Sequence, residues 1–183
     1  MTKDRIKQRS KLLSLILRHK PERAGLRLGE GGWVEIDDLL AGLFAMNKRM
    51  TRDQLLEVVE TNDKKRFTIS EDGKFIRAAQ GHSVDVDLGL NPITPPSELY
   101  HGTATRFMKA ISKEGLRTMN RDHVHLSADI ETATKVATRH GVPVILKVDT
   151  AAMHAAGQEF YQADNGVWLT GPIAPKWFEV MKG

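Results

Sequence analysis

The spacing of hydrophobic and polar positions predicts a chain of short helices and strands. In the stretch LLSLILRHKP, Leu12, Leu15 and Ile16 recur at i, i+3 and i+4 and predict a helical stripe that faces a core. Pro21 cannot continue a helix, and it disfavours helical backbone in the residue before it. We therefore expect the first helix to cover residues 4–19.

Two polar side chains, Arg18 and His19, fall in the last turn of this helix. One interpretation is an ordinary basic end, because the helix dipole favours cations there. The other is an anion site, in which a planar guanidinium stands beside a group that titrates near neutrality. The stretch alone leaves both interpretations open.

The rest of the first half predicts a strand, two more helices and a hairpin. The expected elements are a Gly-rich turn at GLRLGEGG, a strand over 33–35, a helix over 36–47, a helix opened by the capping box of Thr51 and Gln54, and two strands in RFTIS and FIRAA joined by Asp72-Gly73. A helix, a strand, two helices and a β-hairpin are typical of a winged helix. That fold commonly binds nucleic acid, although many copies do not.

The second half has a different organisation. Residues 82–97 hold three of the seven prolines and predict a linker between a lobe at 1–81 and a lobe at 98–183. The second lobe is expected to contain a strand in ELYHGT that runs into a loop, a helix from Thr105 to about Glu114, a strand in HVHLS, a helix over 129–140, a strand in PVILKVDT, a short helix over 151–156 and a turn at Asp164-Asn165-Gly166, with strands predominating toward its end. The whole chain is thus predicted to be α+β.

Composition narrows the class of protein. The chain has 183 residues, 40% hydrophobic content and no cysteine, which excludes disulfides and thiolate metal sites. No window has the length of a membrane span, and the first residues, MTKDRIKQRSK, are too charged for a secretory signal. We expect a soluble cytoplasmic protein, with a monomer as the default.

Charge separates the two lobes. Residues 1–81 carry 17 Lys and Arg against 12 Asp and Glu, whereas residues 82–183 carry 10 against 11. The first lobe is therefore near +5 and the second near −1. A basic lobe beside a neutral one suggests that the first lobe meets a polyanion such as RNA or DNA.

The strand HVHLS carries unusual chemistry on one face. Strand alternation places His123, His125 and Ser127 on one side and Val124 and Leu126 on the other. Three interpretations remain open: a metal site, with His101 as a third ligand, a hydrogen-bonded structural pair, or the lining of a pocket.

Further candidates are weaker when each is taken alone. His101-Gly102-Thr103 follows an apolar strand, where the glycine would let a ligand approach the backbone, although a plain turn explains it as well. Arg66 begins the hairpin and Arg121 precedes the histidine strand, and each is also explained as a solvated surface charge. Phosphate loops of the P-loop or dinucleotide type are absent, as are serine-elbow and kinase signatures.

Five motifs taken together are more specific. LSLILRHKP, KKRF, LYHGT, RDHVHLSAD and NGVWLTGPIAPKWF, in this order, resemble the RNA 2′-phosphotransferase family of the KptA/Tpt type, over essentially the whole chain. The resemblance implies an N-terminal winged-helix RNA lobe and a C-terminal lobe of the ADP-ribosyltransferase fold that binds NAD⁺. It implies removal of an internal RNA 2′-phosphate through an ADP-ribosylated RNA intermediate, with release of nicotinamide and ADP-ribose 1″,2″-cyclic phosphate.

The resemblance also assigns roles to residues. The catalytic set falls on Arg18, His19, Arg66 and Arg121, which are expected to converge on one phosphate. NAD⁺ is expected to contact the second lobe at His101, Gly102, Thr103, His125, Ser127 and Arg139, and no metal is implied.

One departure concerns a triad that many ADP-ribosyltransferases share. Where those relatives carry His, Tyr and Glu, this chain has His101, His125 and Val167. A glutamate would repel an anionic acceptor, so its absence agrees with a phosphate nucleophile. Two other functions remain as alternatives: an ADP-ribosyltransferase that modifies terminal phosphates of nucleic acid, and a non-enzymatic nucleic-acid binder with a ligand-sensing lobe.

Overall fold

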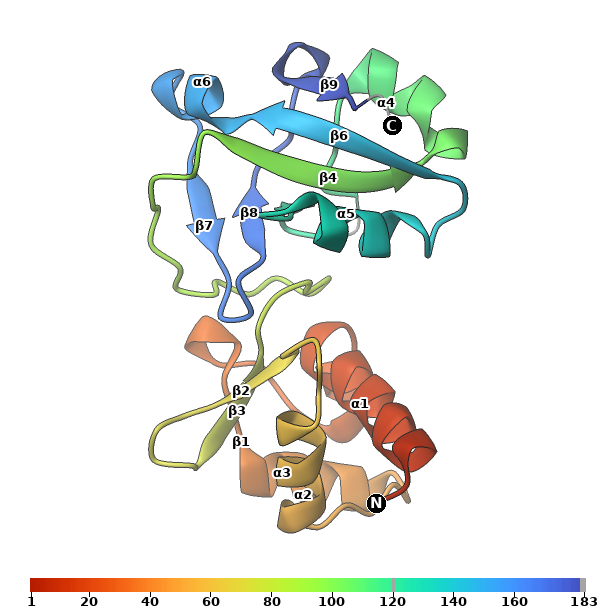
Figure 1. Ribbon diagram of the computed structural model, residues 1–183. Coiled ribbons are helices and arrows are strands. Elements are labelled where there is room, and N and C mark those ends of the chain that lie inside the picture. Colours follow the sequence, from red (N-terminus) through yellow and green to blue (C-terminus); the bar gives the residue numbers. More distant parts are fainter. Residues whose placement is uncertain (120, 182–183) are drawn as a thin grey trace. The chain divides into compact units, whose positions relative to one another are not determined.

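The computed structural model, which describes residues 1–119 and 121–181, contains two compact units, Met1–Leu90 and Asn91–Gly183 (Figure 1). The division falls inside the 82–97 segment, and residues on each side of it pack onto their own unit. The amide of Gly31 donates to the carbonyl of Asp87 at 2.9 Å in the first unit, and the amide of Ile93 donates to that of Phe160 at 2.8 Å in the second.

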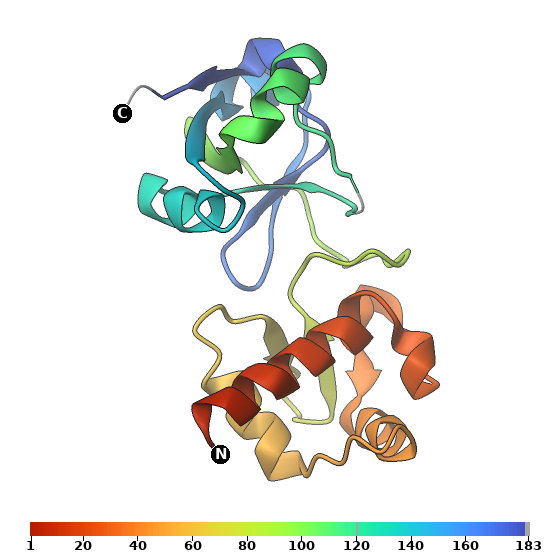
Figure 2. The same cartoon turned by 90° about the vertical axis from the view of Figure 1, so that its right-hand side faces the viewer.

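The first unit combines three α-helices with a small antiparallel sheet. Its elements are α1 (Lys3–Arg18), the 3-10 turns η1 (Pro21–Ala24) and η2 (Glu30–Gly32), β1 (Val34–Glu35), α2 (Ile36–Ala45), α3 (Arg52–Glu60), β2 (Phe67–Ile69) and β3 (Phe75–Ala78). The strand order is β1-β3-β2, and both pairings are antiparallel. Helix α1 contacts α3, β3 and η1, and Figure 2 shows it running along the unit.

The buried stripe of α1 differs from the predicted one. Leu13, Ile16 and Leu17 are fully buried, whereas Leu12 and Leu15 are only half-buried. Apolar residues fill all but one position from Leu12 to Leu17, so two overlapping stripes satisfy the same helical spacing. Packing selects the second stripe.

Other local predictions in this unit are confirmed. Thr51 accepts a hydrogen bond from the Gln54 amide while the Gln54 side chain accepts one from the Thr51 amide, which completes the capping box. The hairpin turns at Gly73, whose φ of +71° is the left-handed conformation that a glycine adopts without strain. Strand β1 starts at Val34 and α2 ends at Ala45, slightly inside the predicted limits.

The second unit contains two three-stranded antiparallel sheets, β4-β6-β9 and β5-β8-β7. Its elements are β4 (Glu98–Ala104), η3 (Thr105–Phe107), α4 (Met108–Glu114), β5 (Val124–Leu126), α5 (Ile130–Ala137), β6 (Pro143–Asp149), α6 (Thr150–Ala155), β7 (Phe160–Gln162), β8 (Trp168–Thr170), η4 (Pro175–Trp177) and β9 (Phe178–Val180). Helix α5 packs against β4 and β6, as Figure 1 shows. The α+β class is therefore confirmed.

One predicted helix start is wrong. Thr105 does not cap a helix: it begins η3, a 3-10 turn without a side-chain cap, and α4 follows only at Met108. The Thr105 amide instead donates to the carbonyl of Val142 at 3.0 Å, which prolongs the β4–β6 pairing by one residue. Asp129 does cap α5, through the Thr132 amide. Over the described residues, no helix has the length and apolar character that crossing a membrane requires.

Candidate active site

The C-terminal end of α1 places two of the predicted catalytic residues. Arg18 is the last helical residue, and His19 is the cap, whose amide donates to the carbonyl of Leu15. Ser83, far along the chain, lies against both: its amide donates to the Arg18 carbonyl at 2.9 Å, and its Oγ lies 2.9 Å from His19 Nδ1. A residue of the segment after β3 therefore fixes the backbone and the imidazole at this helix end.

Arg66, at the start of the hairpin, lies against the same helix end. Arg18 Nη2 donates to the Arg66 carbonyl at 3.4 Å. The Arg66 guanidinium donates to Asn62 Oδ1 at 3.3 Å, and the buried Asn62 amide donates in turn to Ser10 on α1 at 3.1 Å. Within the first unit, Arg18, His19 and Arg66 are thus brought together.

A buried histidine lies beside this group. His82 is 1% exposed, and neither ring nitrogen makes a hydrogen bond of ordinary geometry, although the backbone of Leu17 slightly favours its charged form. Burial, followed by the charges of Arg18, His19 and Arg77, lowers the pKa of His82 to about 4. His82 is therefore neutral at pH 7 and adds no cation to the group.

The lowered pKa of His82 predicts a pH dependence of stability. The folded pKa lies below the unfolded value of about 6.5, so the unfolded chain binds the extra proton and folding loses stability as pH falls from about 6.5 toward 4. We expect this group to contribute about 3 kcal/mol to the loss across that window. Denaturant unfolding at several pH values measures it.

His82→Leu removes the titrating ring, so its unfolding free energy should fall less steeply with pH than that of the parent chain. His154→Leu, which removes an exposed imidazole, is the matched control and should retain the parent slope. Equal slopes in the parent and His82→Leu would contradict the assignment.

In the second unit, β4 and β5 bring the predicted histidines together. His123, His125 and Ser127 are partly exposed while Val124 and Leu126 are buried, so the predicted alternation is confirmed. His101 on β4 donates from Nδ1 to the carbonyl of His125 at 3.0 Å, and burial lowers the pKa of His101. His101 is consequently neutral, with its Nε2 an acceptor.

Arg121 fixes the opposite tautomer of the His125 ring. The Arg121 guanidinium lies 3.0 Å from His125 Nδ1, and because a guanidinium only donates, Nδ1 accepts and Nε2 carries the proton. His101 therefore presents an acceptor at Nε2 and His125 presents a donor at its own Nε2. The main-chain bridge between Tyr100 and Ser127, with hydrogen bonds of 2.9 and 2.7 Å, ties the two strands beside these residues.

The other predicted contacts lie in different surroundings. Thr103 is 5% exposed within β4, whereas Arg139 is exposed beyond the end of α5. Gly102 faces α5, where an added Cβ would stand 1.9 Å from the Ala133 carbonyl oxygen, so helix packing itself requires the glycine. Val167 lies in the turn just before β8.

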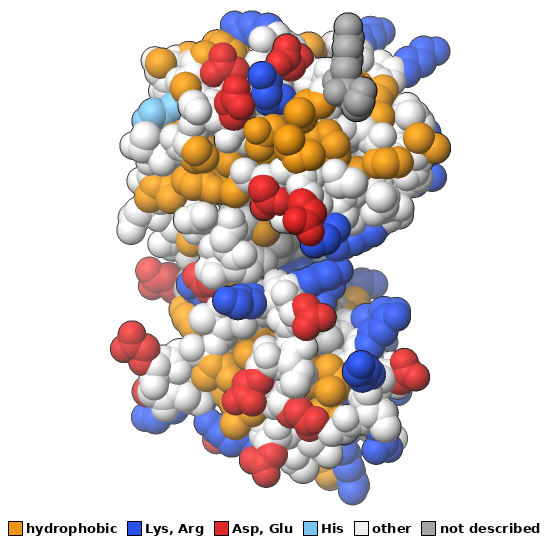
Figure 3. Space-filling view, viewed as in Figure 1, with side chains coloured by type: hydrophobic (Ala, Val, Ile, Leu, Met, Phe, Trp, Pro, Cys, Tyr) orange, Lys and Arg blue, Asp and Glu red, His pale blue; other side chains and the backbone are white. Residues whose placement is uncertain are grey.

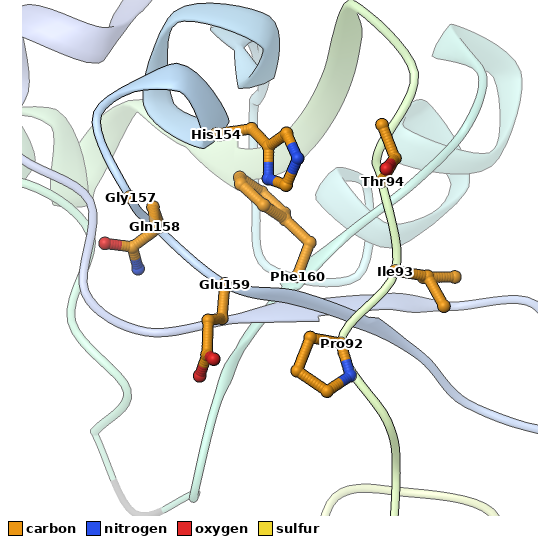
Figure 4. A pocket seen from close by; sticks show the side chains of 8 residues that line it. All are labelled: Pro92, Ile93, Thr94, His154, Gly157, Gln158, Glu159 and Phe160. Atoms are coloured by element: carbon orange, nitrogen blue, oxygen red, sulfur yellow. The ribbon is translucent and has the colours of Figure 1, made fainter.

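Two hollows in the surface involve none of the predicted site residues. One, of about 240 Å³, lies between 92–94 and 154–160 and includes the side chains of His154, Ile93 and Phe160 (Figure 4). The other, of about 440 Å³, lies in the first unit between Arg9 and Phe44. In the described part of the chain, no three histidine or carboxylate side chains are grouped as a metal ion would require.

Comparison with known proteins supplies the family. The model of the family described as "RNA 2'-phosphotransferase, Tpt1 / KptA family" matches residues 4–171, a span that includes every predicted site residue. The chain belongs to the RNA 2′-phosphotransferase family.

Curated relatives of this phosphotransferase family agree over nearly full length. A probable RNA 2′-phosphotransferase of Hahella chejuensis is 51% identical over 97% of this chain and 95% of its own. A probable RNA 2′-phosphotransferase of Agrobacterium fabrum is 56% identical over 90% of this chain and 88% of its own. Another, of Streptomyces coelicolor, is 53% identical over 97% of this chain and 96% of its own.

Sequence reasoning missed the residues that support this candidate site. Asn62 holds Arg66, and Ser83 contacts His19, but neither stands in a motif that signals such a role.

The basic side chains of the first unit agree with its composition: Figure 3 shows Lys and Arg side chains over this unit along the side formed by α1.

Proposed function

We propose that this chain is an NAD⁺-dependent RNA 2′-phosphotransferase. It would transfer an internal RNA 2′-phosphate to NAD⁺ through an ADP-ribosylated RNA intermediate, releasing nicotinamide and ADP-ribose 1″,2″-cyclic phosphate. The observation that carries the proposal is the family match over residues 4–171, which spans every residue assigned a role. The RNA lobe is proposed to be a winged helix and the second lobe an ADP-ribosyltransferase-like fold, as supported by the order of elements in each unit.

Arg18, His19 and Arg66 are proposed to hold the RNA phosphate. A phosphate monoester has a second pKa near 6 and is largely dianionic at neutral pH, so it needs no general base to act as a nucleophile. It needs positioning and charge compensation, which guanidinium groups provide. The contacts of Arg18 with the Arg66 backbone and of Arg66 with Asn62 support this role, because they hold both side chains in place.

The second unit is proposed to bind NAD⁺, which supplies an electrophilic ribose carbon and a nicotinamide leaving group. The donor set fits a dinucleotide with ribose hydroxyls: His101 Nε2 accepts from a hydroxyl, while the protonated Nε2 of His125 donates. Thr103, Ser127, Arg139 and the backbone of Gly102 are the remaining proposed contacts. Arg121 is proposed to act on a phosphate, because a fixed cation stabilises the charge that develops on phosphoryl oxygens.

A short RNA with one internal 2′-phosphate, incubated with the full chain and NAD⁺, tests the proposal. We expect RNA with a free 2′-hydroxyl together with nicotinamide and the cyclic phosphate, and no reaction when NAD⁺ is omitted. A stable ADP-ribosylated RNA, formed also on terminal phosphates, would favour the alternative ADP-ribosyltransferase. RNA binding without nicotinamide release would favour a non-enzymatic binder.

A further inference from the structure

Ser83, in the predicted linker, contacts a proposed catalytic side chain directly. Its Oγ lies 2.9 Å from His19 Nδ1, across 64 positions of sequence. We propose that Ser83 is a positioning residue that orients His19 so that its Nε2 acts on the RNA phosphate, an inference that rests on the proposed function.

The chemistry of a hydroxyl suits this role. A serine hydroxyl both donates and accepts, so it pairs with Nδ1 whether His19 is neutral or protonated. A neutral ring with its proton on Nε2 accepts the hydroxyl proton at Nδ1, and a charged ring donates Nδ1–H to the hydroxyl. In both states Nε2–H is the group directed to an anion.

His101 shows what a different partner would do. Its Nδ1 faces a backbone carbonyl, which only accepts, so the neutral ring carries a lone pair at Nε2. A carbonyl beside His19 would likewise turn a lone pair toward the phosphate oxygens, which repel it. The serine hydroxyl, unlike a carbonyl, also stabilises the tautomer whose Nε2 carries the proton.

The backbone around Ser83 keeps the hydroxyl in place. The Ser83 amide donates to the Arg18 carbonyl, one of the last carbonyls of α1, at 2.9 Å. The preceding residue, His82, is buried in the first unit. Ser83 and His19 are themselves exposed, so their hydrogen bond adds little to folding stability and acts on orientation.

Kinetics with the 2′-phosphorylated RNA and NAD⁺ test the proposal on the full chain. Ser83→Ala keeps the backbone amide and removes the hydroxyl, and we expect kcat to fall about tenfold with KM little changed. Ser83→Thr restores a hydroxyl and should recover most of the rate. Ser112→Ala, at an exposed serine of α4, is the matched control and should behave as the parent chain.

A second readout does not depend on turnover. In the nitrogen NMR spectrum of the histidine side chains, the Nδ1 resonance of His19 should shift in Ser83→Ala and return in Ser83→Thr, whereas that of His154 stays in place. An unchanged His19 resonance, or a Ser83→Ala chain with the parent kcat, would overturn the positioning role. If the parent chain does not turn over the RNA, the proposed function fails, and the NMR result still decides whether Ser83 orients His19.

Discussion

Replacing Arg18 by alanine is expected to lower the rate of 2′-phosphate removal by on the order of a hundredfold while leaving the unfolding free energy nearly unchanged. Removal of a fixed charge that stabilises the transition state costs about 3 kcal/mol. Arg18 ends α1 rather than packing in its core, and the hydrogen bond from its Nη2 to the Arg66 carbonyl is long at 3.4 Å. Steady-state rates and denaturant unfolding of the same preparations measure both effects.

Two further variants make the Arg18 result specific. Arg23→Ala removes an exposed arginine of η1, only a few residues along the chain, and should retain the parent rate. Arg18→Lys keeps the charge but loses the planar fork, so its rate should fall between those of the parent and Arg18→Ala. Normal turnover by Arg18→Ala would show that this helix end is an ordinary basic cap and not an anion site.

Gly102→Ala is expected to destabilise the chain by about 3 kcal/mol or more. The added Cβ would stand 1.9 Å from the Ala133 carbonyl oxygen, 2.8 Å from its carbon and 3.0 Å from the Ala137 amide nitrogen. All three are backbone atoms of α5, and β4 is paired along its whole length with β6, so no flexible side chain can move aside. Helix α5 must shift as a body, and the loss is measured by denaturant unfolding.

Gly157→Ala separates this clash from backbone strain. Gly157 has a φ of +93° but no atom within 4 Å of an added Cβ, so alanine there should cost only about 1 kcal/mol. If the two variants lost the same stability, the close approach of α5 to β4 would not be the reason that residue 102 is glycine.

Local signals in the sequence predicted much of the fold. The capping box at Thr51 and the Asp-Gly turn of the first hairpin each act within a few residues, so a short stretch is enough to identify them. The prediction of which stripe of α1 is buried was wrong because Leu12 and Leu13 both fit the helical period, and only packing distinguishes them. The predicted helix start at Thr105 was wrong because the Thr105 amide donates to the carbonyl of Val142, which directly precedes β6 and lies outside the local sequence.

The candidate site was predictable only in part. Arg18 and His19 stand out beside a proline that ends a helix, and the alternation of polar and apolar residues in HVHLS can be recognised from the sequence. The partners that hold these residues come from elsewhere: Asn62 and Ser83 lie far along the chain from α1, and their contacts depend on how the hairpin and the following segment fold back. No periodicity connects positions so distant in sequence.

The opposite proton placement on the two paired histidines makes this surface directional. His101 offers a lone pair at Nε2, whereas His125 offers an N–H. A polar molecule that donates to the first and accepts from the second forms both hydrogen bonds. In the reversed orientation its donor would face the His125 N–H and its acceptor would face the His101 lone pair. Each mismatch of this kind costs about 1–3 kcal/mol. Two rings of the same amino acid therefore select one orientation of whatever lies across them, although they carry no net charge difference.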